Sequence, residues 1–221
     1  MTPRIHAIYN IFNEAQFIKQ SLESVTWCDN IVVVDGAFDG FPAAQPQSND
    51  GTMRIAAETL QQHRVDHIFY QFDHFAKGYE KTNAMLRHVP DGDYMLRMNG
   101  DEVVMGTPDL LKDYIADTNY LPFYQIPEWP PKQKNRAYYV PKLIKKTPTL
   151  KLTSKHIALT NTFTPEYRLG ELPRGRVLPM EANVSLINVI HYCNERNAER
   201  QLQNRQWLKY YMAHQYVQNI I

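Results

Sequence analysis

The chain contains the run Ile31-Val32-Val33-Val34-Asp35-Gly36, in which four β-branched residues are stopped by an acid and a glycine. Such a run without polar alternation predicts a strand that is buried on both faces, as in a parallel sheet. Ile5–Tyr9 is a second short apolar run, and apolar residues recur at helical spacing over Asn13–Val25 between the two. This order predicts a βαβ unit.

The alternation of strand and helix patterns continues to about residue 105. We expect strands at Val65–Phe72 and Tyr94–Met98 and helices at Met53–Arg64 and Tyr79–His88. Ser48 or Asp50 is the expected N-cap of the helix at Met53–Arg64. Alternation of this kind predicts an α/β fold of Rossmann-like type, in which a mainly parallel sheet is flanked by helices.

The second half of the chain has a different pattern, rich in proline and aromatic residues. Here we expect a helix at Thr107–Ala116, extended segments at Phe123–Ile126, Ala137–Lys145 and Ile157–Thr160, and a terminal amphipathic helix from Asn194 to Ile221. No linker is long enough to divide the chain, so we expect one domain.

The composition limits the class of protein. The 221 residues are 43% hydrophobic with a formal net charge of +1, which is typical of a globular chain and argues against an all-over nucleic-acid-binding surface. Cys28 and Cys193 form no Cys-x-x-Cys pair, so we expect no zinc cluster, and we expect two thiols, with one disulfide as the alternative. The sequence shows no signal peptide and no apolar run of membrane-spanning length, and we expect a soluble, cytoplasmic protein.

Polar residues follow three of the expected strands, at Asn10 to Glu14, at Asp35, and at Asn99 to Glu102. Ligands of open α/β sheets bind beyond the carboxyl ends of the strands, so three polar ends at one edge indicate a site. The alternative is that Asn, Asp and Gly end these strands only because they form turns.

These segments together resemble the motif set of family 2 nucleotide-sugar glycosyltransferases with the GT-A fold. The resemblance rests on Asn13-Glu14, Val33-Val34-Asp35, Ser48-Asn49-Asp50-Gly51-Thr52 and Asn99-Gly100-Asp101-Glu102, in that order. It implies a nucleotide-sugar-binding half over residues 1–105, an acceptor-side half over 106–193 and a C-terminal helix over 194–221.

The resemblance also implies roles for individual residues. The nucleotide would be bound by Asn10, Asn13, Glu14, Asp35, Lys81, Asn99 and Gly100, with Asp35 on the base or ribose and Lys81 on the diphosphate. Lys81 is equally well explained as a solvated helix lysine. Asp50 either assists the nucleotide or caps a helix.

Asn99-Gly100-Asp101 stands where the family has Asp-x-Asp, which implies a divalent cation, Mn²⁺ or Mg²⁺, on Asp101. Asn99 replaces the first Asp of that motif, and Glu102 is either a supporting residue or an ordinary salt-bridge partner. His191 matches the C-terminal histidine that such enzymes often bring to the metal. Its alternative is a buried histidine bonded to backbone.

The acceptor side is less well defined by the sequence. Glu128 is our candidate general base, with Trp129 beside it as a platform for a sugar; the alternatives are a solvated loop glutamate and a core-packed tryptophan. Part of the family carries a His-Glu pair in the region that aligns with His156-Ile157, where the Glu is absent here. No Asp or Glu occurs from Trp129 to Pro165, and eight Lys and Arg residues do, which indicates a positive surface for a phosphorylated or anionic acceptor, or a solvated face.

We therefore expect a metal-dependent, inverting transferase that moves a sugar from a UDP-linked donor to a hydroxyl of a glycan. Two alternatives remain open. One is a catalytically weak nucleotide- or sugar-binding module, suggested by Asn99 and the missing base. The other is a glycosyltransferase that acts on DNA, suggested by the basic segment.

Overall fold

The computed structural model of the protein describes residues 3–106, 108, 111, 120–126, 138–146, 148, 187–192 and 198–207. These residues form an eight-stranded sheet in the order β3-β2-β1-β4-β7-β6-β8-β5. The strands are β1 Ile5–Ile11, β2 Asn30–Asp35, β3 His67–Gln71, β4 Tyr94–Asn99, β5 Glu102–Gly106, β6 Tyr120–Ile126, β7 Tyr138–Lys145 and β8 Ile187–His191. The helices are α1 Ile18–Glu23, α2 Thr52–His63 and α3 Gly78–Leu86, and residues 198–207 form a further helical segment.

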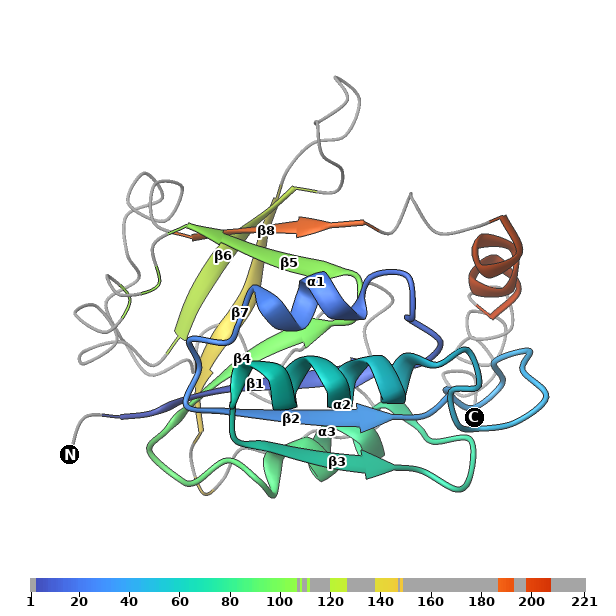
Figure 1. The fold of residues 1–221 in the computed structure, drawn as a ribbon, viewed down its shortest axis with the longest axis horizontal. Coiled ribbons are helices and arrows are strands. Elements are labelled where there is room, and N and C mark those ends of the chain that lie inside the picture. The colour runs from blue at the N-terminus through green and yellow to red at the C-terminus, as the bar shows by residue number, and fades with distance from the viewer. Residues whose placement is uncertain are drawn as a thin grey trace, which may run out of the picture.

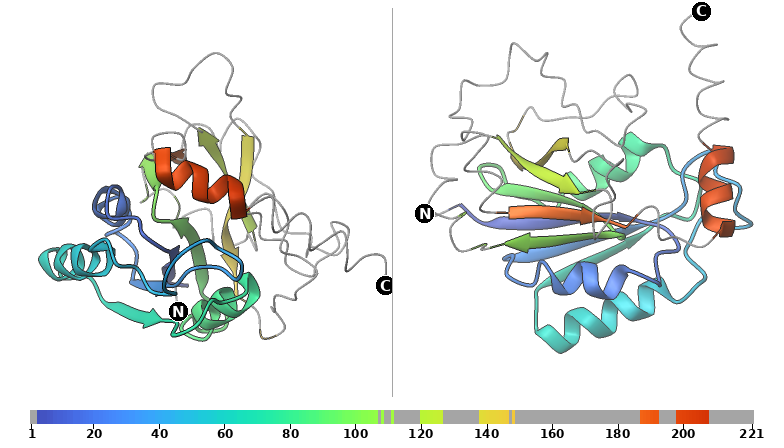
Figure 2. Two further views of the ribbon diagram at one scale, coloured as in Figure 1. Left: turned by 90° about the vertical axis from the view of Figure 1, so that its right-hand side faces the viewer. Right: turned by 90° about the horizontal axis from the view of Figure 1, so that it is seen from above.

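Strands β3, β2, β1 and β4 form a parallel half-sheet, as the apolar runs predict. Helices α1 and α2 cover one face and α3 covers the other, which the right-hand view of Figure 2 shows edge-on. The apolar side chains of β2 alternate between the two cores, with Val33 in the first and Val34 in the second. Burial of both faces explains why this strand carries no polar alternation.

The other half of the sheet is mixed. Strand β7 pairs antiparallel with β4 and β6, β8 runs parallel to β6, and β5 lies at the far edge, antiparallel to β8. Strand β5 packs beside α1 (Figure 1), where Val104 N–H donates to Ser24 Oγ at 3.0 Å. The expected α/β class, with a mixed, mainly parallel sheet flanked by helices, is confirmed.

Several expected boundaries are corrected. The first helix begins at Ile18 and not at Asn13, because Asn13 has a left-handed φ of 48° and the Glu14 carbonyl accepts from the Phe17 and Ile18 amides to form a turn. The N-cap of α2 is Gly51, neither Ser48 nor Asp50.

Strand β5 is an element that the sequence analysis did not predict. The expected extended segments near residues 123 and 140 are confirmed as β6 and β7. The expected helix at Thr107–Ala116 and strand at Ile157–Thr160 lie largely or wholly outside the described residues, as does Cys193, whereas Cys28 packs in the core as a thiol. None of the described helices combines the length and apolar character needed to cross a membrane.

Candidate functional site

The carboxyl ends of three strands meet at one edge of the sheet. Ile11 at the end of β1 is in register with Asp35 at the end of β2, and Asn10 is in register with Asn99 at the end of β4. The helix over residues 198–207 lies at this same edge, to which the arrows of β2 and β3 point in Figure 1. The segments that the motifs singled out are therefore neighbours in space.

Asp35 is fully buried, and its carboxylate is bound by the protein itself. It accepts hydrogen bonds from Ser48 N–H at 2.9 Å, Ser48 Oγ at 2.5 Å and Gln71 Nε2 at 3.1 Å. A nucleoside that bound Asp35 would have to share or replace these donors. Its expected contact with base or ribose stays a prediction.

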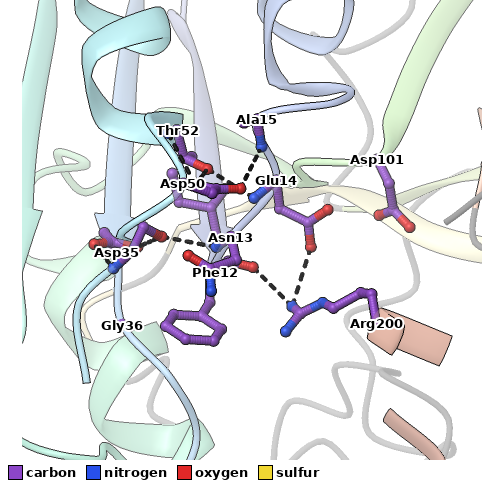
Figure 3. A network of polar contacts seen from close by, with 12 residues as sticks. Phe12, Asn13, Glu14, Ala15, Asp35, Gly36, Asp50, Thr52, Asp101 and Arg200 are labelled. Carbon is purple, nitrogen blue, oxygen red and sulfur yellow. Dashed lines mark hydrogen bonds and ion pairs between the residues drawn. The ribbon is translucent and has the colours of Figure 1, made fainter. Parts of the chain in front are cut away.

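Ser48 to Thr52 hold the loop that follows β1 in place. Asn13 N–H donates to Ser48 Oγ and Glu14 N–H donates to Thr52 Oγ1, both at 2.7 Å. Asp50 accepts from Ala15 N–H and from Thr52 N–H, both at 3.0 Å. Asp50 therefore bonds the first residue of α2 without being its N-cap, and it joins the two loops (Figure 3).

Glu14 crosses directly over the turn that follows β4. A Cβ placed on Gly100 would lie 2.7 Å from both Cβ and Cγ of Glu14, so only glycine allows this approach. Gly100 thus brings the loop after β1 against the Asn99–Asp101 turn. The structure shows this close backbone approach, and the expected role of Gly100 in nucleotide binding stays a prediction.

Arg200, in the C-terminal helical segment, reaches the same loop. Its Nη2 donates to the Phe12 carbonyl at 2.7 Å and lies 3.5 Å from Glu14 Oε1 (Figure 3). Its guanidinium also lies over the rings of Phe12 and Phe41, at 5.2 and 4.7 Å from their centroids. The side chain is only 12% exposed, so a permanent positive charge is fixed at this edge of the sheet.

Trp207 secures the other end of the helical segment. Its ring stacks on Phe38 with centroids 5.2 Å apart, and its Nε1 donates to the Asp39 carbonyl at 3.1 Å. Arg200 and Trp207 lie seven residues apart, which places both on one helix face. The sequence analysis missed Arg200, although this spacing was a signal that could have identified it.

Asp101 and His191 are brought together by the pairing of β5 with β8, in which Glu102 is opposite His191. His191 Nε2 lies 3.2 Å from Asp101 Oδ2, and Tyr192 N–H donates to the Asp101 carbonyl at 2.9 Å. Asp101 is fully buried and His191 is 14% exposed at the side chain.

A carboxylate and an imidazole suit Mn²⁺, and they suit Mg²⁺ less well. Among the described residues no group of three or more His, Cys, Asp or Glu side chains could hold a metal, so a cation on this pair would need further ligands from a substrate or water. The chemistry of this pair fits a divalent cation, and by itself the pair supplies only part of a coordination shell.

Glu102 belongs to a charged cluster with buried Lys142 and half-buried Arg97. Its carboxylate accepts from Lys142 Nζ at 2.6 Å, from Asn99 N–H at 2.8 Å and from Asn99 Nδ2 at 3.2 Å. Burial lowers the pKa of Arg97 to about 10, and burial lowers the pKa of Lys142 although Glu102 opposes the shift. Glu102 is a salt-bridge partner, and it also orients Asn99.

Not all basic side chains of the segment from Trp129 to Pro165 lie at the surface. Lys142 is buried in the cluster, which corrects the expectation that it contributes to a positive face. Lys146 binds Asp91 at 2.7 Å. The remainder of the segment from Trp129 to Pro165, including His156, lies largely outside the described residues, and so does Glu128.

Lys81 is buried beneath the ends of β1 and β2 and is not a solvated helix lysine. Its Nζ donates to the carbonyls of Ile11, at 3.2 Å, and Gly36, and it lies 4.8 Å from the centre of the Phe38 ring. Burial lowers its pKa to about 7, although Asp35 opposes the shift. Its contact with a diphosphate stays a prediction, because the protein's own carbonyls bind its amine here.

Asn10 lies half-buried on β1, next to Asn99 on β4. Its side-chain Oδ1 is buried and has no hydrogen-bond partner among the described residues. A buried amide oxygen without a donor is costly, so this atom is a candidate to accept a hydrogen bond from a bound ligand or water molecule.

No protein-family model matches the chain, and no curated protein matches it. Solved structures that resemble it include the mannosyltransferase PcManGT from Pyrobaculum calidifontis in complex with GDP-Man and Mn²⁺, at 20% identity and a TM-score of 0.44, over 56% of this chain and 36% of that one. S. aureus TarS resembles it at 16% identity and a TM-score of 0.43, over 72% of this chain and 26% of that one. A structure of S. aureus TarS 1-349 resembles it at 18% identity and a TM-score of 0.42, over 72% of this chain and 43% of that one. The chain thus spans less than half the length of each of these proteins.

Proposed function

We propose that the chain is a metal-dependent glycosyltransferase that moves a sugar from a nucleoside diphosphate sugar, UDP-linked, to a hydroxyl of a glycan. The observation that supports this most strongly is the pairing of Asp101 with His191 beside the loop after β1. A carboxylate and an imidazole at the carboxyl edge of an α/β sheet form a suitable anchor for a cation and a diphosphate.

Asp101 and His191 would hold Mn²⁺ or Mg²⁺, which would stabilise the negative charge that develops on the leaving nucleoside diphosphate. Arg200, whose guanidinium is fixed at this edge, would share the charge-neutralising role that the sequence suggests for Lys81. Asn10 and the Asn13–Glu14 loop would contact the nucleoside, together with Asp35.

In the transfer itself, the acceptor oxygen would attack the anomeric carbon as its bond to the diphosphate breaks, with inversion at that carbon. Glu128 is our candidate to take the proton from the acceptor hydroxyl. The acceptor would then be a glycan, or a phosphorylated or anionic molecule that meets the basic segment.

Calorimetric titration of UDP, with GDP as comparison, in the presence and absence of Mn²⁺ tests this proposal. We expect binding that requires the metal and that is lost in Asp101→Ala. Asp73→Ala is the matched control, since Asp73 is 94% exposed at the side chain and pairs with its neighbour His74. Failure of every nucleoside diphosphate to bind with metal present would overturn the proposal.

A second candidate is a nucleotide- or sugar-binding module without turnover. It is favoured by Asn99, whose amide is bonded to Glu102, and by the internal bonding of Asp35. Sustained sugar transfer that disappears in Asp101→Ala would exclude this candidate.

A third candidate is a glycosyltransferase that acts on DNA. Salt-sensitive retention of the protein on duplex DNA would support it, and no retention at low salt would count against it.

A further inference from the structure

A cavity of about 330 Å³ lies between the loop after β1 and the helical segment over residues 198–207. The loop wall includes Glu14 and Asp50, and the helix wall includes Glu199 and Gln203. This volume is at the small end of the range for ligand sites, so the cavity suits a single ring better than a whole nucleotide.

The two walls differ in how far their polar groups are already bonded. On the loop wall, Asp50 accepts backbone hydrogen bonds and Glu14 pairs with Arg200. On the helix wall, Gln203 Nε2 donates to Glu199 Oε1 at 3.4 Å, and the two side chains bond to no other described residue. The helix therefore presents a carboxylate and an amide that can turn to a ligand at little cost.

The charge of the lining selects among ligands. Three carboxylates, those of Glu14, Asp50 and Glu199, face one guanidinium, that of Arg200. An excess of negative charge disfavours an anionic ligand. Hydroxyl groups both donate and accept, so they satisfy carboxylates and amides equally well. Phe17 adds an aromatic group to the same lining.

We propose that this cavity binds an uncharged sugar ring and discriminates against sugar acids, with Glu199 and Gln203 as the residues that recognise its hydroxyls. This inference rests on the proposed glycosyl transfer and specifies its substrate class. Glu14 lines the cavity and also lies over Gly100, next to Asp101, so a ring in the cavity would adjoin the proposed diphosphate site. The ring belongs either to the donor or to the end of the acceptor.

The test compares Gln203→Ala and Glu199→Gln with wild type, and uses Gln206→Ala as a matched control because Gln206 is exposed on the same helix and does not line the cavity. Calorimetry with Mn²⁺ present uses four probes: UDP, UDP-glucose, UDP-glucuronate and methyl glucoside. We expect Gln203→Ala to weaken binding of a neutral sugar probe about 3- to 10-fold with no change for UDP. An effect on UDP-glucose alone assigns the cavity to the donor, and an effect on methyl glucoside alone assigns it to the acceptor.

The charge argument predicts that wild type binds UDP-glucuronate more weakly than UDP-glucose and that Glu199→Gln narrows this gap. Unchanged affinity of both variants for the neutral sugar probes, or an equal loss for UDP itself, would overturn the inference. If neither UDP nor GDP binds wild type with Mn²⁺ present, the proposed function fails, and methyl glucoside still reports on the cavity independently.

Discussion

Replacement of Gly100 by alanine tests the contact that brings the loop after β1 against the turn after β4. The new Cβ would lie 2.7 Å from Cβ and Cγ of Glu14 and 3.3 Å from Cγ2 of Ile11. Cβ of Glu14 is fixed to its backbone, so the loop itself would have to move. The φ of Gly100 lies outside the left-handed region, so the cost is steric and not conformational.

Overpacking of this kind costs about 1–3 kcal/mol, which for a domain of this size lowers Tm by roughly 2–12 °C. The assay is urea unfolding of Gly100→Ala, followed by the same substitution in a Glu14→Gly background. Glu14→Gly removes both atoms at 2.7 Å and leaves only the 3.3 Å contact with Ile11. The cost of Gly100→Ala should then fall below about 1 kcal/mol.

Either of two results would refute this reasoning. Gly100→Ala could prove as stable as wild type, which would mean that the loop does not lie against the turn. Alternatively, the cost could be the same in both backgrounds, which would place the clash elsewhere than at Glu14.

Three further predictions concern the surroundings of the site. Lys81 has a folded-state pKa of about 7 against the usual 10.5, so between pH 7 and about 10 the unfolded chain binds more protons and the free energy of unfolding of wild type should rise. Lys81→Met should abolish this rise, which urea unfolding at both pH values measures. A rise in the variant equal to that of wild type would contradict the prediction. Ser48→Ala should cost about 1–3 kcal/mol in the same assay, since it removes a donor to buried Asp35 and the acceptor of an amide; a loss within error of zero counts against those bonds. Trp207→Ala should speed proteolysis near the C-terminal helix about 10-fold or more with little change in global Tm, and protection equal to wild type would show that its contact with Asp39 does not hold the helix.

The parallel half of the fold could be predicted because its strands carry strong local signals. The β-branched run of β2 is buried on both faces, and the helices between the strands show clear periodicity. Strand β5 could not be predicted, because the turn at Gly100 and Asp101 comes directly before it and its partner strand, β8, lies far along the chain. The start of α1 was wrong because Asn13 resembles a helix start, whereas its amide is taken by Ser48.

Some features of the candidate site could likewise be predicted from the sequence, and others could not. Asp101 and His191 were proposed together from motifs, and antiparallel pairing of β5 with β8 brings them within 3.2 Å. Burial of Lys81 and Lys142 could not be foreseen, because a lysine in a helix or strand pattern does not reveal which face is covered. Arg200 belongs to no motif; its seven-residue spacing from Trp207 places both on one helix face, but only the docked helix shows which groups the guanidinium contacts.

Crystals grown with UDP and Mn²⁺ and measured for anomalous scattering test the central claim most directly. The account predicts a manganese peak bonded to Asp101 and His191 and to phosphate oxygens of the nucleotide. A peak at a different place with the nucleotide well ordered, or an ordered nucleotide whose phosphates lie away from these two side chains, would contradict it.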